Sequence, residues 1–386
     1  MDKVIRQAVY IAFGVAIVLY LAQLFTPLRL DSDGIAYLSL ADSASREGVF
    51  SAVRQTNFPF PKGYPAFVFL LMRAGIFSSP LLVISNLLLF AVALVFSFRT
   101  LIALGFQRSH ATIACLLTLL SFAAVKHVTQ GRSDFLFFAL SACACWLMTV
   151  SSPYKWVALL PCIVCAIEVR FIGLALIAPL AVTAWPSVSK HRMALAAAAV
   201  VALGCMGVGI WVGHHYLASN FHIFKNNGPW RFVEKNVIAH SQDFGELVVN
   251  APFSKLPSWS HGPMLIIGGA AWLLFFAGIA AVWRRSLWLA GYLIAYGGLI
   301  FPWPYTDPRF WLPAMPLVLL ATHSGLMALF ETLPRGMLVA YDVIFCALGF
   351  AALIYSTPDI FWPELCLPLR RWTAHERVSR ALHNIN

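Results

Sequence analysis

The sequence predicts an all-α, polytopic integral membrane protein with about eleven transmembrane helices. Two observations lead to this fold class. The 386 residues are 60% hydrophobic and only 11% charged, whereas soluble domains carry about 25% charged residues. Apolar windows long enough to cross the hydrocarbon core of a bilayer also recur along the chain. These windows fall near residues 8–28, 81–103, 111–127, 134–150, 154–169, 171–186, 193–217, 263–283, 286–303, 310–330 and 337–356.

The basic residues outside these windows orient the chain. Lys3 and Arg6 place the N-terminus in the cytoplasm, because cytoplasmic segments are enriched in lysine and arginine. The first window has no small-residue cleavage site, so we expect a retained span rather than a signal peptide. Residues 1–357 then form one membrane domain with long external loops at 29–80 and 218–262. The basic tail, 358–386, would lie outside with eleven spans, so either the number of spans differs by one or the tail is interfacial.

The first external loop is expected to contain two helices that lie on the membrane. Apolar residues recur at three- and four-residue spacings over 34–46, which predicts an amphipathic helix that begins at a cap formed by Asp31 and Asp33. A second apolar run, 66–76, is too short to span the bilayer. The other long loop is rich in aromatic residues and is expected to be structured.

The net charge of +11 could indicate binding to nucleic acid. Most basic residues, however, occur singly between apolar windows, where membrane topology and anionic lipids explain them, so no nucleic-acid partner is expected. The eight cysteines lie mostly within apolar windows, as small packing residues do. The histidines lack the spacing of metal ligands, and no metal or cofactor is expected. A divalent cation held by Asp31 and Asp33 stays open as an alternative.

The remaining polar residues gather on the non-cytoplasmic side under this topology. They come from the first external loop, the turn after the third window, the junction within 154–186 and the segment before the tenth window. The candidate site residues are Asp31, Asp33, Tyr37, Lys62, Tyr64, Arg132, Asp134, Glu168, Arg170, Tyr305 and Arg309. Ionisable groups at membrane depth are functional candidates by default.

Carboxylates and arginines on one face suit transfer of a group from a phosphate. A carboxylate can accept the proton of a hydroxyl as a general base. Arginine and lysine can hold a phosphate, and arginine does so with two parallel hydrogen bonds. Oriented charges in a site shielded from water stabilise such a transition state. The combination describes glycosyl transfer from a lipid-linked phosphosugar.

Four motifs resemble those of glycosyltransferases with the GT-C fold. The segment 33–37, Asp-Gly-Ile-Ala-Tyr, resembles their D-x-x-x-Y signature in the first external loop, and Gly63-Tyr64-Pro65 resembles the segment that follows it. The segment 132–136, Arg-Ser-Asp-Phe-Leu, resembles a turn with an acid that enters the fourth span. Tyr305 and the run 309–316 resemble the R-[YF]-x-L-P-x-x-P segment. The chain is thus similar to the ArnT-like and protein O-mannosyltransferase-like enzymes, which use polyprenyl-phosphate sugars.

This resemblance implies a GT-C fold and an inverting transferase. It would move a hexosyl or pentosyl group from a polyprenyl-phosphate donor to a lipid, glycan or protein acceptor at the non-cytoplasmic face. Asp33 matches the family's catalytic base, with Asp31 beside it, and only Asp33 keeps the four-residue spacing to Tyr37. The chain departs from the family at Gly34, where a second acid is frequent, and in having no large soluble C-terminal domain.

Simpler roles for the same residues stay open. Asp31 could serve only as a helix cap that also favours the helix dipole. Arg132 and Arg309 could anchor the chain at the interface or pair with Asp134 and Asp307, and Arg170 could pair with Glu168. Lys62 and Tyr64 could serve only to position a chain reversal.

Alternative functions are a lipid-linked-sugar flippase and another membrane transferase, such as an O-antigen ligase. A flippase should show charges in the middle of spans and an internal repeat, and neither is evident in the sequence. An acyltransferase would need a catalytic histidine in a span, which is not evident either. The short loops and the absence of an Asn-X-Ser/Thr sequon favour a bacterial inner membrane, with the site facing the periplasm.

Overall fold

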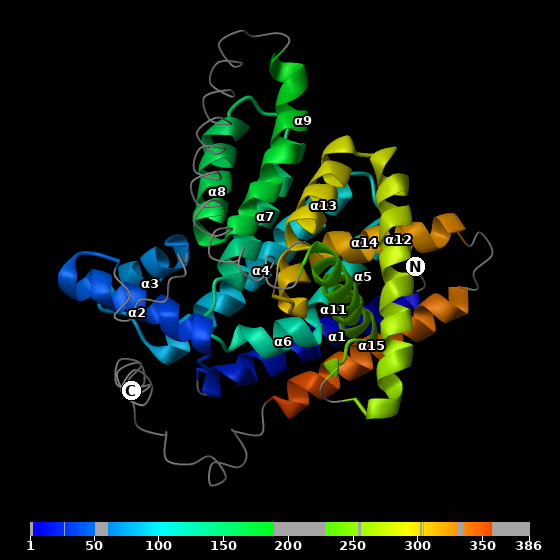
Figure 1. Cartoon of the computed structure of the whole chain (residues 1–386), viewed down its shortest axis with the longest axis horizontal. Helices are drawn as coiled ribbons and strands as arrows, with labels where there is room; N and C mark the ends of the chain where they lie inside the picture. Colours follow the sequence, from blue (N-terminus) through cyan, green and yellow to red (C-terminus); the bar gives the residue numbers. More distant parts are fainter. Residues whose placement is uncertain are drawn as a thin grey trace.

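The computed structural model describes residues 3–26, 28–50, 61–188, 228–253, 256–301, 303, 305–329 and 335–356 (Figure 1). These residues form helices, with no β-structure beyond an isolated bridge between Arg29 and Gln130, so the predicted all-α class is confirmed. The helices are α1 Lys3–Ala22, η1 Gln23–Phe25, α2 Ser32–Glu47, α3 Gly63–Arg73, α4 Ser79–Ala103, α5 Arg108–Leu119, α6 Phe122–Val128, α7 Asp134–Thr149, α8 Lys155–Val169, η2 Phe171–Leu176, α9 Ile177–Val188, α11 Pro229–Val249, η4 Ser258–Ser260, α12 His261–Trp283, α13 Leu287–Ile300, η5 Pro308–Ala314, α14 Met315–Leu329 and α15 Arg335–Tyr355.

Several helical segments are long and apolar enough to cross a membrane, as an integral membrane protein requires. In the described part of the chain they are Gln7–Phe25, Ser79–Ala103, Ser258–Trp283, Pro308–Leu329 and Gly336–Tyr355. Helices α5 and α6 add a sixth if the 50° bend between them lies within one span. The prediction of about eleven spans is not confirmed, because windows 134–150, 154–169, 171–186 and 286–303 form shorter helices. Window 193–217 and the tail 358–386 lie outside the described residues.

One polar residue explains why the apolar run 154–186 does not form a single helix. Arg170 has an extended backbone, with φ −149° and ψ 132°, and this conformation ends α8. The chain continues as the 3₁₀ helix η2 and then as α9. Gly173 allows η2 to lie directly against α8, since a Cβ at this position would lie 2.7 Å from the backbone of Ala166.

The two expected helices of the first external loop are present as α2 and α3, which lie to one side of the upright helix α12 (Figure 1). The carboxylate of Asp31 caps α2 by accepting a hydrogen bond of 2.8 Å from the backbone N–H of Gly34. Helix α3 begins at Gly63, three residues earlier than predicted, and packs against α2 through the rings of Tyr37 and Tyr64, whose centroids are 5.3 Å apart.

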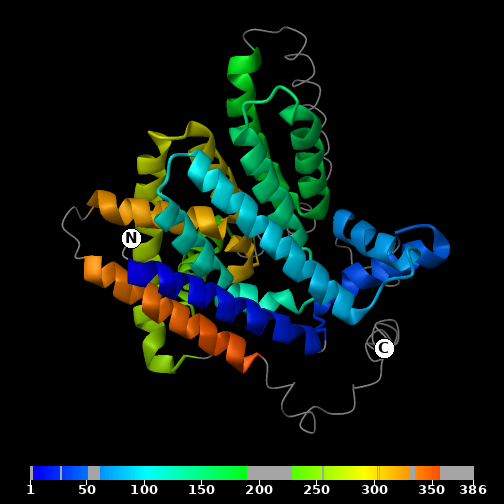
Figure 2. The same cartoon turned by 180° about the vertical axis from the view of Figure 1, so that it is seen from behind.

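The described part of the segment 218–262 is structured, as expected, because α11 covers residues 229–249 and packs on α12. Its Phe244 stacks on Trp272 at 4.2 Å and meets Trp311 of η5 edge-on. Helix α12 also lies against α14, and glycines allow this approach: a Cβ at Gly278 would lie 1.7 Å from a carbonyl oxygen of α14. Figure 2 shows α1 and α15 side by side on the opposite face. This packing fixes the position of η5, which carries part of the candidate site.

Candidate active site

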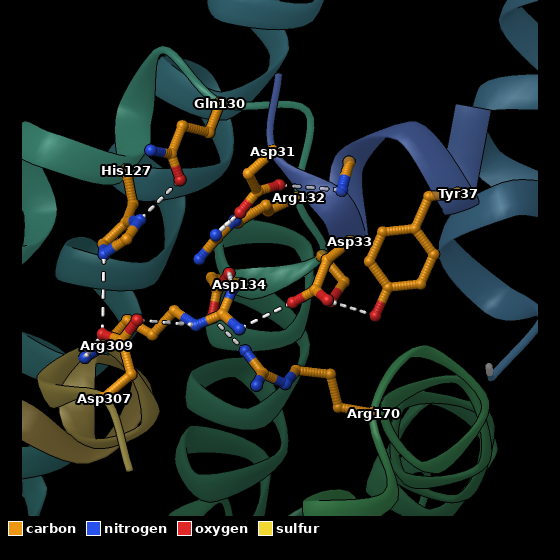
Figure 3. Close-up of polar contacts among 12 residues, drawn as sticks. Asp31, Asp33, Tyr37, His127, Gln130, Arg132, Asp134, Arg170, Asp307 and Arg309 are labelled. Atoms are coloured by element: carbon orange, nitrogen blue, oxygen red, sulfur yellow. Dashed lines mark hydrogen bonds and ion pairs between the residues drawn. The ribbon is translucent and has the colours of Figure 1, made fainter. Parts of the chain in front are cut away.

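Four segments that are distant in the sequence bring ionisable side chains together at one end of the helices (Figure 3). They are the start of α2, the turn between α6 and α7, the end of α8 and the start of η5. The side chains are Asp31, Asp33, Arg132, Asp134, Arg170, Asp307 and Arg309. The structure therefore gathers most of the residues that the sequence singled out.

The turn that carries Arg132 and Asp134 is held by backbone and amide contacts. The side-chain amide of Asn86, on α4, donates hydrogen bonds of 2.9 and 2.8 Å to the carbonyls of residues 128 and 130. The start of α2 lies directly against this turn: a Cβ at Gly34 would be 3.2 Å from the carbonyl oxygen of Gly131. This close approach gives a structural reason for glycine at position 34.

Arg309 lies among three carboxylates and connects η5 with α2 and α7. Its guanidinium donates a hydrogen bond of 2.6 Å to Asp33 and lies 3.3 Å from Asp307 and 3.9 Å from Asp134. The Arg309 side chain is only 12% exposed, whereas the Asp33 side chain is 29% exposed. Asp33 is thus the more accessible partner of a mostly buried arginine.

The other two arginines each pair with a different acid. Arg132 forms an ion pair with Asp31, and Arg170 forms one with Asp134. The possible pairing of Arg170 with Glu168 is wrong, because Glu168 is exposed at the end of α8 while Arg170 turns towards α7. Burial, with a smaller contribution from the nearby Arg309, lowers the pKa of Arg132 to about 10.

A cavity of about 500 Å³ opens beside this cluster. It is lined by Ser32, Asp33, Ala36, Tyr37, Pro61, Arg132, Arg170, Phe171, Ile172, Leu299, Ile300, Trp303, Tyr305, Thr306, Asp307, Arg309 and Phe310. Two buried nitrogens of Arg132, Nε and Nη1, have no hydrogen-bond partner among the described residues. Unpaired donors of a buried cation are costly and favour an anionic ligand.

The predicted tyrosines lie in different places. Tyr37 lines the cavity, its hydroxyl accepts a hydrogen bond of 3.3 Å from Ser133, and burial raises its pKa. Tyr305 also lines the cavity, at 48% exposure. Tyr64 is fully buried behind Tyr37 and does not line the cavity. Lys62 and Glu168 are exposed and do not line it either. The structure thus gives Tyr64 a packing role and places Lys62 and Glu168 outside the cavity.

The sequence analysis missed His127, which lies next to the ion pairs (Figure 3). Its ring is 2% exposed, with Nδ1 2.6 Å from the side-chain oxygen of Gln130 and Nε2 3.8 Å from Asp307. His127 is thus a neighbour of Asp307, the acid that lies 3.3 Å from Arg309. The available signal was its position three residues before Gln130 at the end of an apolar window.

The arrangement of side chains suits an anion beside a carboxylate better than it suits a metal ion. In the described part of the chain, no three His, Cys, Asp or Glu side chains are grouped so that they could bind a metal ion. Asp31 and Asp33 each face an arginine rather than each other. A divalent cation at these acids stays an untested alternative.

Comparison with known proteins identifies the fold. No family model and no curated protein matches the sequence. Among solved structures, the chain is similar to ArnT from Cupriavidus metallidurans in the apo state, with a TM-score of 0.52 and 15% identity over 98% of this chain and 68% of that one. The same protein bound to undecaprenyl phosphate gives a TM-score of 0.48 and 15% identity over 92% and 72% of the two chains. The chain has the fold of ArnT, a GT-C glycosyltransferase, as the motifs led us to expect.

Proposed function

We propose that this chain is a membrane glycosyltransferase that moves a sugar from a polyprenyl-phosphate donor to an acceptor at the non-cytoplasmic face. The observation that carries the proposal is the cavity whose lining includes three arginines together with Asp33. The leaving phosphate needs cations, and the attacking hydroxyl needs a base. Both kinds of group line one cavity whose volume suits a small-molecule substrate.

Arg132 is the first candidate to bind the donor phosphate. Its two buried, unpaired nitrogens can donate to phosphate oxygens without breaking a contact seen in the structure. Arg170 and Arg309 line the same cavity and can add further positive charge. ArnT, whose apo structure shares this fold, has been crystallised with undecaprenyl phosphate, a member of the same lipid class.

Asp33 is the proposed base, and Asp31 has a structural role. One carboxylate oxygen of Asp31 accepts from the N–H of Gly34 and the other faces Arg132, so both are engaged at the start of α2. Asp33 lines the cavity and is held by Arg309. When a donor phosphate binds Arg309, it replaces Asp33 as the partner of the guanidinium. The carboxylate is then available to the acceptor.

The reaction follows as a single displacement. The acceptor oxygen attacks the anomeric carbon while the bond from that carbon to the phosphate oxygen breaks. The acceptor proton passes to the carboxylate of Asp33, and polyprenyl phosphate leaves with its charge held by the arginines. Direct attack opposite the leaving group inverts the anomeric carbon. The transferred group is a hexose or pentose, and the acceptor is a lipid, a glycan or a protein, in a bacterial inner membrane with the site facing the periplasm.

The decisive experiment uses purified chain in lipid vesicles with a panel of polyprenyl-phosphate sugars and acceptors. The proposal expects release of polyprenyl phosphate by the native chain and its loss, by at least a hundredfold, in Asp33→Asn. Asp42→Asn is the matched control, because Asp42 lies on the same helix but pairs with Arg46 away from the cavity. Translocation of the donor without its cleavage would instead identify a flippase. Native turnover by Asp33→Asn would exclude Asp33 as the base.

A further inference from the structure

A second cavity, of about 430 Å³, borders η5 at other residues than the polar cavity does. Helices α5, α11, α12, α14 and α15 surround it, and nearly all of its lining is apolar. Phe310 borders the polar cavity, whereas the next residue, Trp311, borders this one. A molecule in this second cavity would therefore contact η5, the segment that carries Arg309, without entering the proposed active site.

The packing of α15 opens this cavity towards the membrane. Helix α15 packs mainly against α1, α5 and α6 and runs at a steep angle to α12 (Figures 1 and 2). Met337 of α15 and Ile267 of α12 line the cavity and are nevertheless 60% and 41% exposed. Both helices have the length and composition of membrane spans. We therefore expect the opening to face lipid hydrocarbon.

The length of the cavity limits what can fill it. Its lining on η5 and α14 runs from Trp311 to Leu326, which is about 24 Å at about 2.0 Å per residue in the 3₁₀ helix and 1.5 Å in the α-helix. This length lies between half and the whole of the roughly 30 Å hydrocarbon core. It suits one extended acyl chain that enters from the leaflet beside η5. A polyprenyl chain of many isoprene units would extend well beyond it.

The indole of Trp311, in the wall of the cavity, indicates which chemical group would lie at the end of such a chain. The indole Nε1 of Trp311 has no hydrogen-bond partner among the described residues, although the side chain is fully buried. Indole is a donor only, and a buried donor without an acceptor is costly. The ester carbonyl at the top of an acyl chain is an acceptor that lies at the required end of the cavity.

We propose that this cavity binds one acyl chain of a glycerophospholipid from the leaflet next to η5, with the ester carbonyl on the indole of Trp311. The bound chain fills the space between α12, α14 and α15 and supports η5 from behind. This assignment does not depend on the proposed transferase activity. The chemistry required is a straight hydrocarbon chain with a carbonyl at one end.

The test compares two substitutions at neighbouring positions of α12. Leu274 lines the cavity, whereas Leu273 is 70% exposed on the outer face of the same helix. A tryptophan at position 274 occupies the space of the chain. In native mass spectrometry of protein extracted in mild detergent, we expect one retained phospholipid for the native chain and for Leu273→Trp, and at least tenfold lower occupancy for Leu274→Trp. Equal occupancy in the two variants, retention of a polyprenyl lipid or no retained lipid in the native chain would overturn the proposal.

A second measurement needs only the native chain, in case Leu274→Trp does not fold. Phosphatidylethanolamine with a photoreactive diazirine in its acyl chain is added to vesicles that contain the protein, and adducts are mapped by peptide mass spectrometry. The proposal expects the highest labelling on cavity residues such as Leu117 and Met337. Labelling there that does not exceed labelling of Leu88, which is 63% exposed outside the cavity, would also overturn it.

Discussion

Replacing Arg309 with lysine gives the most direct test of how the polar site works. The guanidinium of Arg309 contacts Asp33 at 2.6 Å, Asp307 at 3.3 Å and Asp134 at 3.9 Å, so one planar group connects three acids. Lysine keeps the positive charge but presents it as a point on a flexible stem. It can maintain one strong contact but cannot bridge a carboxylate and a phosphate in the same way.

The expected size of the effect follows from the contacts that are lost. A hydrogen bond to a charged group contributes about 1.5–3 kcal/mol, and about 1.4 kcal/mol corresponds to a tenfold change in rate. Loss of one such bond in Arg309→Lys should therefore lower kcat/KM for the donor by roughly ten- to 150-fold. The thermal midpoint in detergent should change little, because the charge among the acids is kept. Initial rates of polyprenyl phosphate release measure the first effect, and a melting curve measures the second.

Arg46→Lys is the matched control. Arg46 forms an ion pair with Asp42 on α2, and its side chain is 55% exposed. The same substitution there should leave kcat/KM unchanged, because exposed ion pairs contribute little. Turnover by Arg309→Lys within twofold of the native chain would refute the role given to the planar guanidinium. An equal loss in Arg46→Lys would show that the measured effect is not specific to the site.

Three further predictions concern the parts that hold the site in place. Asn86→Leu removes the amide donor from two carbonyls of the Arg132 turn, and the carbonyl of residue 130 keeps only the backbone N–H of Arg132. It should therefore destabilise the chain by about 1–3 kcal/mol in denaturation assays and lower turnover; unchanged stability would contradict this. Gly325→Ala places a Cβ 2.0 Å from a carbonyl of α12 and should cost about 1–3 kcal/mol, whereas Gly269→Ala, with open space, should not destabilise; equal melting midpoints would contradict it. Burial raises the pKa of Asp243, despite the opposing contact with His240, so this acid costs stability as pH rises through its unfolded-state pKa. Asp243→Asn should therefore be more stable than the native chain at neutral pH, and the difference in stability should vanish at low pH. Melting curves recorded across pH would refute this if the difference in melting midpoint grew on acidification.

Local patterns in the sequence were sufficient to predict the elements around the site. The acids at 31 and 33 followed by apolar residues at helical spacing predicted α2 and a cap formed by both acids. The structure confirms the helix and the cap by Asp31, whereas Asp33 lies within the first turn. The charged residues near 170 predicted the break in the run 154–186. These features depend on neighbours in the chain, which a sequence displays directly. The number of spans was predicted less well, because several apolar windows fold as helices shorter than a bilayer is thick.

Pairing between segments could not be predicted in the same way. Arg170 is two residues from Glu168 but pairs with Asp134, because its extended backbone turns the side chain towards α7. Tyr64 lies in a segment that resembles a motif of GT-C enzymes, but it packs behind Tyr37. Of the two tyrosines, only Tyr37 lines the cavity. His127 is one histidine at the end of an apolar window, and its proximity to Asp307 depends on where η5 lies. Such contacts depend on the tertiary arrangement rather than on spacing.

The balance of charge in the cluster explains why donor binding and activation of the base should be one event. Three arginines lie among four carboxylates, so the arginines are already occupied before an anion arrives. A phosphate can gain a second cation beyond Arg132 only by taking one from a carboxylate. Asp33 is better placed to yield than Asp134, because it is accessible from the cavity whereas Asp134 is 1% exposed. Without a donor, the carboxylate of Asp33 remains bonded to Arg309. Under the proposed function, a bound donor phosphate would also release the carboxylate of Asp33, so the acceptor would react only after the donor is in place.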